Sequence, residues 1–135
     1  MKKLITLFTM LFMSACLFAQ VSEGEKHALL DFYISTNGDT WNTTWDANTP
    51  VAEWHGVTVK NNQVVAVNLM FNNLKGHLPT SIGQLENLQS LELSFNQITG
   101  TLPVSIGGMT QLKTLAINGN QLEGTIPESL GNLSN

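Results

Sequence analysis

The 135-residue chain contains no arginine, and its six lysines stand against ten acidic residues, for a formal net charge of −4 at pH 7. Nucleic-acid-binding proteins present a face rich in Lys and Arg, and Arg is the residue best suited to phosphate. The composition therefore excludes nucleic acid as an expected partner. Cysteine is equally scarce, because Cys16 is alone and cannot close an intramolecular disulfide. We expect a fold that forms without disulfides.

Signatures of catalysis are also missing. The chain has no G-x-S-x-G string, no phosphate-binding loop and no pair of catalytic carboxylates. The histidines His27, His55 and His77 have no metal-ligand spacing to one another, whereas a zinc site needs His, Cys or carboxylate ligands at short spacing. We therefore expect a protein that is not an enzyme and that uses no cofactor and no metal.

The longest apolar run lies at the N-terminus. Met1 and two lysines precede an apolar stretch from Leu4 to about Ala19, after which the chain turns polar. This order is typical of a secretory signal peptide, here residues 1–19, and it predicts a secreted or cell-surface protein. The stretch is short for a bilayer span of about 20 residues, so a retained transmembrane anchor is only the alternative. The sequence around Cys16 loosely resembles a lipobox, which leaves a lipoprotein as a further alternative.

A repeat of 24 residues fills the second half of the chain. Residues 64–87, 88–111 and 112–135 align without gaps. Five columns recur at this spacing: Asn72, Asn96 and Asn120; Leu74, Ile98 and Leu122; Gly76, Gly100 and Gly124; Pro79, Pro103 and Pro127; and Gly83, Gly107 and Gly131. Self-similarity at such a period indicates a solenoid in which each coil buries its apolar face against its neighbours.

Each repeat contains the pattern of a short strand followed by a turn. Leu91 and Leu93 are expected to point into the solenoid and Glu92 outward, because side chains alternate along a half-buried strand. Where the chain leaves the strand, the amide of an asparagine can both donate to and accept from backbone groups that the bend leaves unpaired. We therefore expect a ladder of stacked asparagines: Asn72, Asn96 and Asn120.

The pattern L-x-x-L-x-L-x-x-N-x-L-x-G-x-[LI]-P resembles the leucine-rich repeat, in the 24-residue subtype of plant receptor ectodomains that is also seen in secreted bacterial proteins. The resemblance covers residues 64–135. It implies an α/β-type repeat solenoid, a right-handed superhelix with short parallel β-strands on its concave face and an N-terminal helical cap. It also implies a role in recognition of other molecules.

Residues 20–63 are expected to form this cap. Ser22 and Glu25 have the spacing of a capping box, and the apolar residues that follow predict a helix from about 23 to 35, which ends at Asn37 and Gly38. The oxygen-rich segment 37–42 lacks the Gly and the final Glu of an EF-hand loop. It is therefore interpreted as a turn with side-chain-to-backbone hydrogen bonds, with a calcium loop as the alternative.

Three tryptophans follow the predicted helix: Trp41, Trp45 and Trp54. This segment resembles the N-terminal capping domain of leucine-rich repeat proteins, in which two cysteines close a disulfide, but the two slots hold Ala52 and Val59. The departure fits the cysteine-free caps of bacterial relatives. The tryptophans are expected to seal the apolar end of the solenoid, and carbohydrate stacking by an exposed Trp41 or Trp45 is the alternative.

Outward positions of the strands are free of the core and lie in register from coil to coil, so a binding site is expected there. The candidate residues on the concave face are Asn68, Met70, Phe71, Glu92, Ser94, Phe95 and Asn118. Phe71 and Phe95 could anchor a protein or peptide. Alternatively, they are packing residues, which are common immediately before the asparagine of this repeat.

These observations favour a secreted or cell-surface module that recognises a protein, a peptide or a glycan and is not catalytic. Two alternatives remain. The chain could be the N-terminal targeting or binding region of a larger enzyme or receptor, because it stops where a fourth strand would begin and has no polar closing unit. It could also be a structural element that self-associates through its open C-terminal coil.

Overall fold

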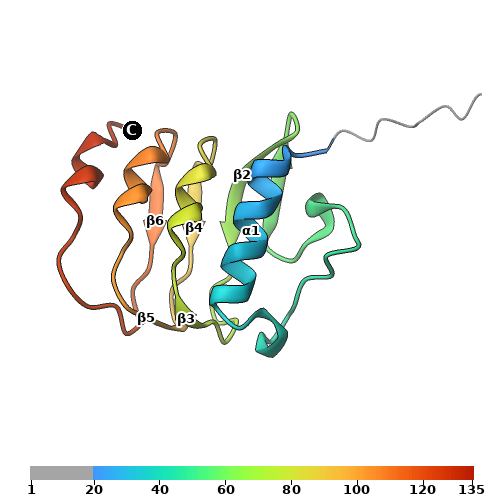
Figure 1. Ribbon diagram of the computed structural model, residues 1–135, viewed down its shortest axis with the longest axis horizontal. Helices are drawn as coiled ribbons and strands as arrows, with labels where there is room; N and C mark the ends of the chain where they lie inside the picture. Colours follow the sequence, from blue (N-terminus) through green and yellow to red (C-terminus); the bar gives the residue numbers. More distant parts are fainter. Residues whose placement is uncertain (1–19) are drawn as a thin grey trace, which may run out of the picture.

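The computed structural model describes residues 20–135, so the expected signal peptide 1–19 and the lipobox cysteine Cys16 lie outside the described residues. In the described part, one helix precedes a row of stacked coils (Figure 1). The helix, α1, spans Glu23–Ser35. The strands are β1 Val57–Lys60, β2 Gln63–Asn68, β3 Lys75–His77, β4 Ser90–Glu92, β5 Gln97–Thr99 and β6 Thr114–Ala116. Short 3-10 helices complete the chain: η1 Gly38–Thr40, η2 Val51–Glu53, η3 Thr80–Gln84, η4 Val104–Gly108 and η5 Glu128–Asn132.

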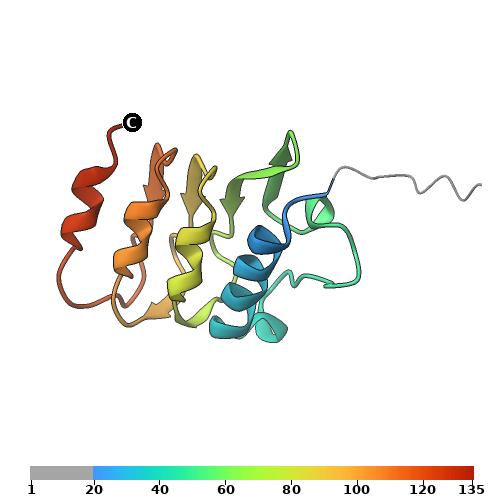
Figure 2. The same cartoon turned by 45° about the horizontal axis from the view of Figure 1, so that its top comes forward.

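The main sheet has the order β1-β2-β4-β6, in which β2, β4 and β6 are parallel. Its register follows the period of the sequence, because Ala66 pairs with Ser90 and Ser90 with Thr114. The helices η3, η4 and η5 lie beside α1 in a row on the other side of the coils (Figure 2). The expected α/β-type repeat solenoid with an N-terminal helical cap is therefore confirmed.

Strand β1 was not predicted. It pairs antiparallel with β2 through a tight turn at Asn61 and Asn62, whose φ angles of 50° and 62° are both left-handed. A two-residue turn of this kind matches the twist of a hairpin, and asparagine tolerates the conformation better than most residues. The end of the expected cap thus joins the sheet of the repeats as an additional edge strand.

Burial in the core depends on the presence of a following coil. Leu91 and Leu93 in the second repeat are fully buried, whereas their equivalents Leu115 and Ile117 in the last described coil are only half-buried. Each coil therefore buries its apolar residues mainly against the next, as expected of a solenoid.

The repeat asparagines join consecutive coils through hydrogen bonds. Asn96 is 7% exposed, and its Oδ1 accepts from the backbone N–H groups of Asn72, at 3.0 Å, and Leu74, at 3.1 Å. Its Nδ2 donates to the carbonyls of Leu69, at 2.8 Å, and Leu93, at 2.9 Å. One amide thus satisfies backbone groups of its own coil and of the preceding one.

The two other asparagines of the column extend these contacts in both directions. Asn120 accepts from the N–H of Ile98 at 3.0 Å and donates to the carbonyl of Leu93 at 2.9 Å. Asn72 exchanges two bonds with Thr43, accepting from its N–H at 2.8 Å and donating to its carbonyl at 3.1 Å. The column therefore connects the cap to the repeats as well as the repeats to one another.

Helix α1 is fixed to the first repeat through its N-terminus. The predicted capping box is formed, with the N–H of Glu25 donating to Ser22 Oγ at 3.2 Å and the N–H of Ser22 to Glu25 Oε2 at 3.3 Å. The carboxylate of Glu25 is buried, and its Oε1 accepts from the N–H of Val64 in β2 at 3.0 Å. A single side chain thus caps the helix and attaches it to the sheet.

The tryptophans are part of the core. Trp45 stacks on Trp54 with ring centroids 4.9 Å apart and meets Trp41 edge-on at 4.9 Å. Their exposed fractions are 6% for Trp41, 6% for Trp45 and 3% for Trp54, and each indole N–H donates to a backbone carbonyl. The alternative of carbohydrate stacking by an exposed Trp41 or Trp45 is therefore wrong, because neither ring has a free face for a sugar.

The segment 37–42 forms the expected turn with a side-chain-to-backbone hydrogen bond, in which Thr40 Oγ1 donates to the carbonyl of Asn37 at 2.9 Å. Asn37 Nδ2 donates to the carbonyl of Lys75 at 2.6 Å. Tyr33 Oη donates to Asp39 Oδ1 at 2.7 Å and lies 2.7 Å from Thr44 Oγ1. The hydrogen bond with Thr44 lowers the pKa of Tyr33, but burial and the hydrogen bond and negative charge of Asp39 outweigh it, so that the pKa is raised above its ordinary value.

The first prediction concerns the asparagine column. Replacing Asn96 by Leu removes the partners of buried backbone groups in two coils, and each such group costs about 1–3 kcal/mol when left unpaired. We expect Asn96→Leu to lower the free energy of unfolding by at least that amount, measured as a lower urea midpoint. Asn132→Leu, at an exposed position of η5, is the matched control and should leave the midpoint nearly unchanged. An unaltered midpoint for Asn96→Leu would remove the structural role of the column.

Candidate recognition surface

The candidate surface, called the sheet face below, consists of the outward side chains of β2, β4 and β6 and of the residues that follow these strands. Ala66, Ser90 and Thr114 form one row across the sheet, and Asn68, Glu92 and Ala116 form the next. The backbone pairing continues beyond the strands, because the N–H of Phe71 donates to Ser94 and that of Phe95 to Asn118. Residues 24 positions apart therefore remain neighbours up to the phenylalanines.

Phe71 and Phe95 form an exposed aromatic pair. Their rings are stacked, with centroids 4.6 Å apart and planes inclined by 8°. Phe71 is 64% exposed and Phe95 is 48% exposed, so neither ring belongs to the core. Exposed aromatic side chains that are held in one orientation are typical anchors of protein interfaces.

The backbone at this column is left-handed. The φ angles are 55° at Phe71, 58° at Phe95 and 70° at Gly119, the equivalent residue of the third coil. Glycine adopts this conformation freely, whereas a bulky residue does so at a cost of roughly 1–2 kcal/mol. Outliers of this kind cluster at functional sites, so two phenylalanines in such a conformation, both open to solvent, point to a function of their side chains.

Gly119 leaves the space that the aromatic pair occupies. A Cβ atom added to Gly119 would lie 2.7 Å from Cδ1 of Phe95. The ring of Phe95 therefore extends over the backbone of the next coil, where Gly119 takes the place of a third aromatic residue.

Glu92 lies on β4, between Asn68 of β2 and Ala116 of β6, and is half-buried. Its Oε2 accepts from Asn68 Nδ2 at 3.1 Å, and its Oε1 accepts from Ser90 Oγ at 3.0 Å. Both donors are neutral. They hold the carboxylate in place between two strands, and a carboxylate oxygen with one hydrogen bond can still accept another.

Ser94 requires a correction. The repeat pattern predicted it to be one of the exposed candidates, but it is 1% exposed, and its Oγ donates to Asn118 Oδ1 at 2.6 Å. The strict alternation of strand residues ends at Glu92, because Leu93 and Ser94 are both buried where the chain turns toward the left-handed Phe95. Ser94 therefore orients Asn118 and is not available to a partner.

The remaining candidates differ in exposure. Asn68 and Asn118 are exposed, and Met70 is half-buried. Two residues that were not among the predicted candidates also support the sheet face. Ser90 Oγ donates to Glu92, and Asn42 Nδ2 donates to the carbonyl of Phe71 at 2.9 Å. The contact of Asn42 joins residues 29 positions apart in the sequence, and no local pattern indicated it.

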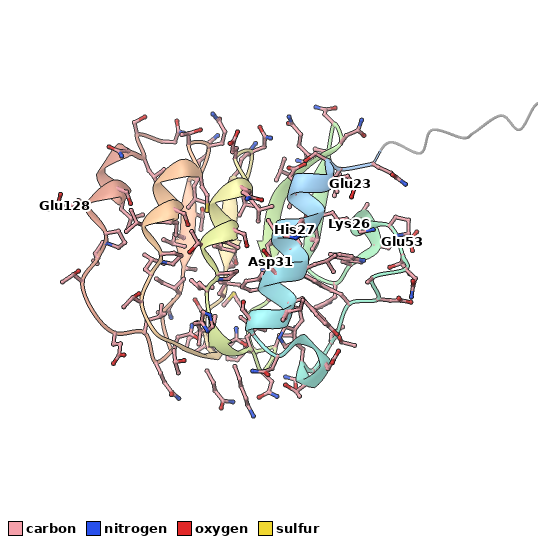
Figure 3. The ribbon with its side chains drawn as sticks, in the orientation of Figure 1. Glu23, Lys26, His27, Asp31, Glu53 and Glu128 are labelled. Atoms are coloured by element: carbon pink, nitrogen blue, oxygen red, sulfur yellow. The ribbon has the colours of Figure 1, made fainter. Side chains whose placement is uncertain are left out.

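Other titratable groups do not gather into a second site. In residues 20–135, no group of three or more His, Cys, Asp or Glu residues could hold a metal ion. His27 lies 3.5 Å from Asp31 on successive turns of α1 (Figure 3). The described chain also has no helix of the length and apolar character that a membrane span needs.

The fold and the repeats of this chain are similar to those of known proteins. The structure resembles the ectodomain of BIR2 from Arabidopsis thaliana, with a TM-score of 0.72, 23% identity, and coverage of 85% of this chain and 64% of that one. Residues 62–122 match the family described as "Leucine rich repeat". These residues therefore belong to the leucine-rich repeat family, and the fold is a leucine-rich repeat solenoid.

Two further relatives are much longer than this chain. A probable leucine-rich repeat receptor-like protein kinase from Arabidopsis thaliana is 41% identical over 61 residues, which cover 44% of this chain and 6% of the kinase. The ectodomain of the Arabidopsis receptor kinase HAESA, solved in complex with an IDA peptide hormone, has a TM-score of 0.67 and 27% identity, with coverage of 81% of this chain and 19% of that one. The present chain thus spans only a small part of these proteins.

The second prediction concerns Gly119. Alanine at this position adds a Cβ against the ring of Phe95 and must adopt a φ of 70°. We expect Gly119→Ala to displace the ring and to lower the free energy of unfolding by about 1 kcal/mol. NMR chemical shifts of the Phe71 and Phe95 ring protons report the displacement, and urea unfolding reports the stability.

Gly131→Ala is the control, because an added Cβ there would have no atom within 4 Å. It should change neither measurement appreciably. Unchanged ring shifts in Gly119→Ala would contradict the described packing of the aromatic pair.

Proposed function

We propose that this protein is a secreted or cell-surface recognition module that binds a protein or peptide on its sheet face and is not catalytic. The observation that carries the proposal is the stacked pair Phe71 and Phe95. Both rings are exposed, and the backbone of both residues is strained. An aromatic pair that contributes little to the core is best explained by contacts with a partner.

The likeness to receptor ectodomains supports the same proposal. The HAESA ectodomain was solved with a peptide hormone ligand, and it shares 27% identity with this chain. The relatives also include a receptor-like kinase, which supports an extracellular or cell-surface location. The signal peptide expected in residues 1–19 agrees with this location but depends on the sequence pattern alone.

The geometry favours binding over catalysis. Glu92 is the one carboxylate at the outward positions of β2, β4 and β6, and its direct neighbours are Asn68, Ser90 and Ala116. General acid–base and nucleophilic mechanisms need a second group within hydrogen-bond reach of the first. The described sheet face offers Glu92 neutral hydrogen-bond donors, which suit a binding surface.

A second arrangement uses the same surface. In it, the recognition module belongs to a larger receptor or enzyme, and the observation that favours it is that this chain spans 6% of the kinase and 19% of the HAESA ectodomain. The intact mass of the protein purified from its native source distinguishes the two arrangements.

The third prediction tests recognition by the aromatic pair. A phage-displayed library of random dodecapeptides is selected on the purified protein, and Kd is measured for enriched peptides. We expect Phe71→Ser combined with Phe95→Ser to weaken binding at least thirtyfold, because an anchor residue contributes about 2 kcal/mol or more. Circular dichroism should show an unchanged fold.

The matched control replaces two exposed apolar residues elsewhere, Ile34 on α1 and Val104 in η4, by serine. This double variant should bind enriched peptides with the Kd of the unmodified protein. The proposal fails if no peptide is enriched, or if the enriched peptides bind the Phe71 and Phe95 variant equally well.

A further inference from the structure

The charge of the sheet face indicates which kind of partner it would bind. Among the outward residues of β2, β4 and β6, which are Ala66, Asn68, Ser90, Glu92, Thr114 and Ala116, Glu92 alone carries a charge. Residues 20–135 as a whole contain four lysines and ten acidic residues. Both the local and the overall charge therefore favour a cationic partner over an anionic one.

The carboxylate of Glu92 has no cationic partner within the described chain. In residues 20–135, the ion pair between His27 and Asp31 is the only one, and the contacts of Glu92 are the neutral donors Asn68 and Ser90. A half-buried carboxylate is partly desolvated, and hydrogen bonds from neutral donors stabilise it less than a cation does. Glu92 thus retains capacity for one strong, charge-assisted contact.

The surroundings of Glu92 leave room for that contact. Its register partner in β6 is Ala116, and its neighbour within β4 is Ser90. Both side chains are small. Asn68 and Ser90 already hold the two carboxylate oxygens, so little conformational entropy remains to be lost when a cation binds.

The aromatic pair lies within reach of the same partner. Phe95 follows Glu92 by three residues, so the Cα atoms of the two residues lie at most about 10 Å apart. A peptide in extended conformation spans this distance with three residues or fewer. The stem of a lysine or arginine can also lie on an aromatic ring.

We propose that the sheet face binds a polypeptide segment that carries a lysine or arginine, whose cationic group pairs with Glu92 while an apolar side chain about three residues away packs on Phe71 and Phe95. The proposal rests on the function proposed above. It adds the charge of the partner and the approximate spacing of its two contact residues.

The test uses the random dodecapeptide library and variants of Glu92. Peptides enriched on the unmodified protein are expected to contain Lys or Arg about three residues from an aromatic or aliphatic residue. Glu92→Gln keeps a side-chain oxygen that can accept from Asn68 or Ser90 but removes the charge. It should weaken binding of these peptides roughly tenfold, the effect expected for a charge-assisted hydrogen bond.

Two further variants separate a local contact from a general effect of charge. Glu86→Gln removes one negative charge at an exposed position of the loop after η3 and should leave Kd unchanged. Selection of the same library on Glu92→Lys should enrich peptides with Asp or Glu in place of the basic residue. Added salt should weaken binding to the unmodified protein more than binding to Glu92→Gln.

The outcomes distinguish this inference from the proposed function. Peptides that depend on Phe71 and Phe95, but show no preference for Lys or Arg and bind Glu92→Gln with unchanged Kd, would overturn the inference and leave the proposed function standing. Failure to enrich any peptide would overturn both. A basic preference that Glu86→Gln abolishes equally would show a diffuse charge effect and would also overturn the role of Glu92.

Discussion

The contact between one coil and the next is the interaction on which the rest of this structure depends. A single coil has one apolar edge and several backbone groups without partners, and it can satisfy neither alone. The neighbouring coil meets both needs. It covers leucines such as Leu91, and its asparagine forms hydrogen bonds with carbonyl and N–H groups of the turn. Where the described stack ends, the equivalents of buried residues are open, as in Ile126, which is 77% exposed.

This division of roles explains how so small a scaffold could carry the recognition surface proposed for it. The inward columns and the asparagines must repeat, because every coil makes the same contacts to the next. The outward positions make few of these contacts and can differ freely, as Asn68, Glu92 and Ala116 do within one row. The repeat fixes the distance between these positions, and the sequence at each of them then determines the chemistry of the face.

Features with a local or repeated pattern were predictable from the sequence, whereas contacts of single residues outside such a pattern were not. The period of 24 residues indicated the coils, and Ser22 with Glu25 indicated the start of α1. The burial of Ser94 was missed because it follows from the left-handed turn at Phe95, which the strand alternation does not show. The contact of Glu92 with Asn68 was missed because the period shows which strand positions are neighbours but not which of their side chains form a hydrogen bond.

The left-handed backbone at Phe71 and Phe95 depends on the contacts between the coils. A strained residue persists only where the flanking structure fixes its backbone on both sides. Here the N–H of Phe95 donates to Asn118 in the next coil, and Asn96, directly after it, is held by hydrogen bonds to two coils. The same bonds that stabilise the stack therefore fix the backbone at Phe95, whose exposed ring stacks on Phe71. An anchor that is ordered before binding loses less entropy when a partner arrives, so the rigidity of the coils would strengthen the binding proposed for this face.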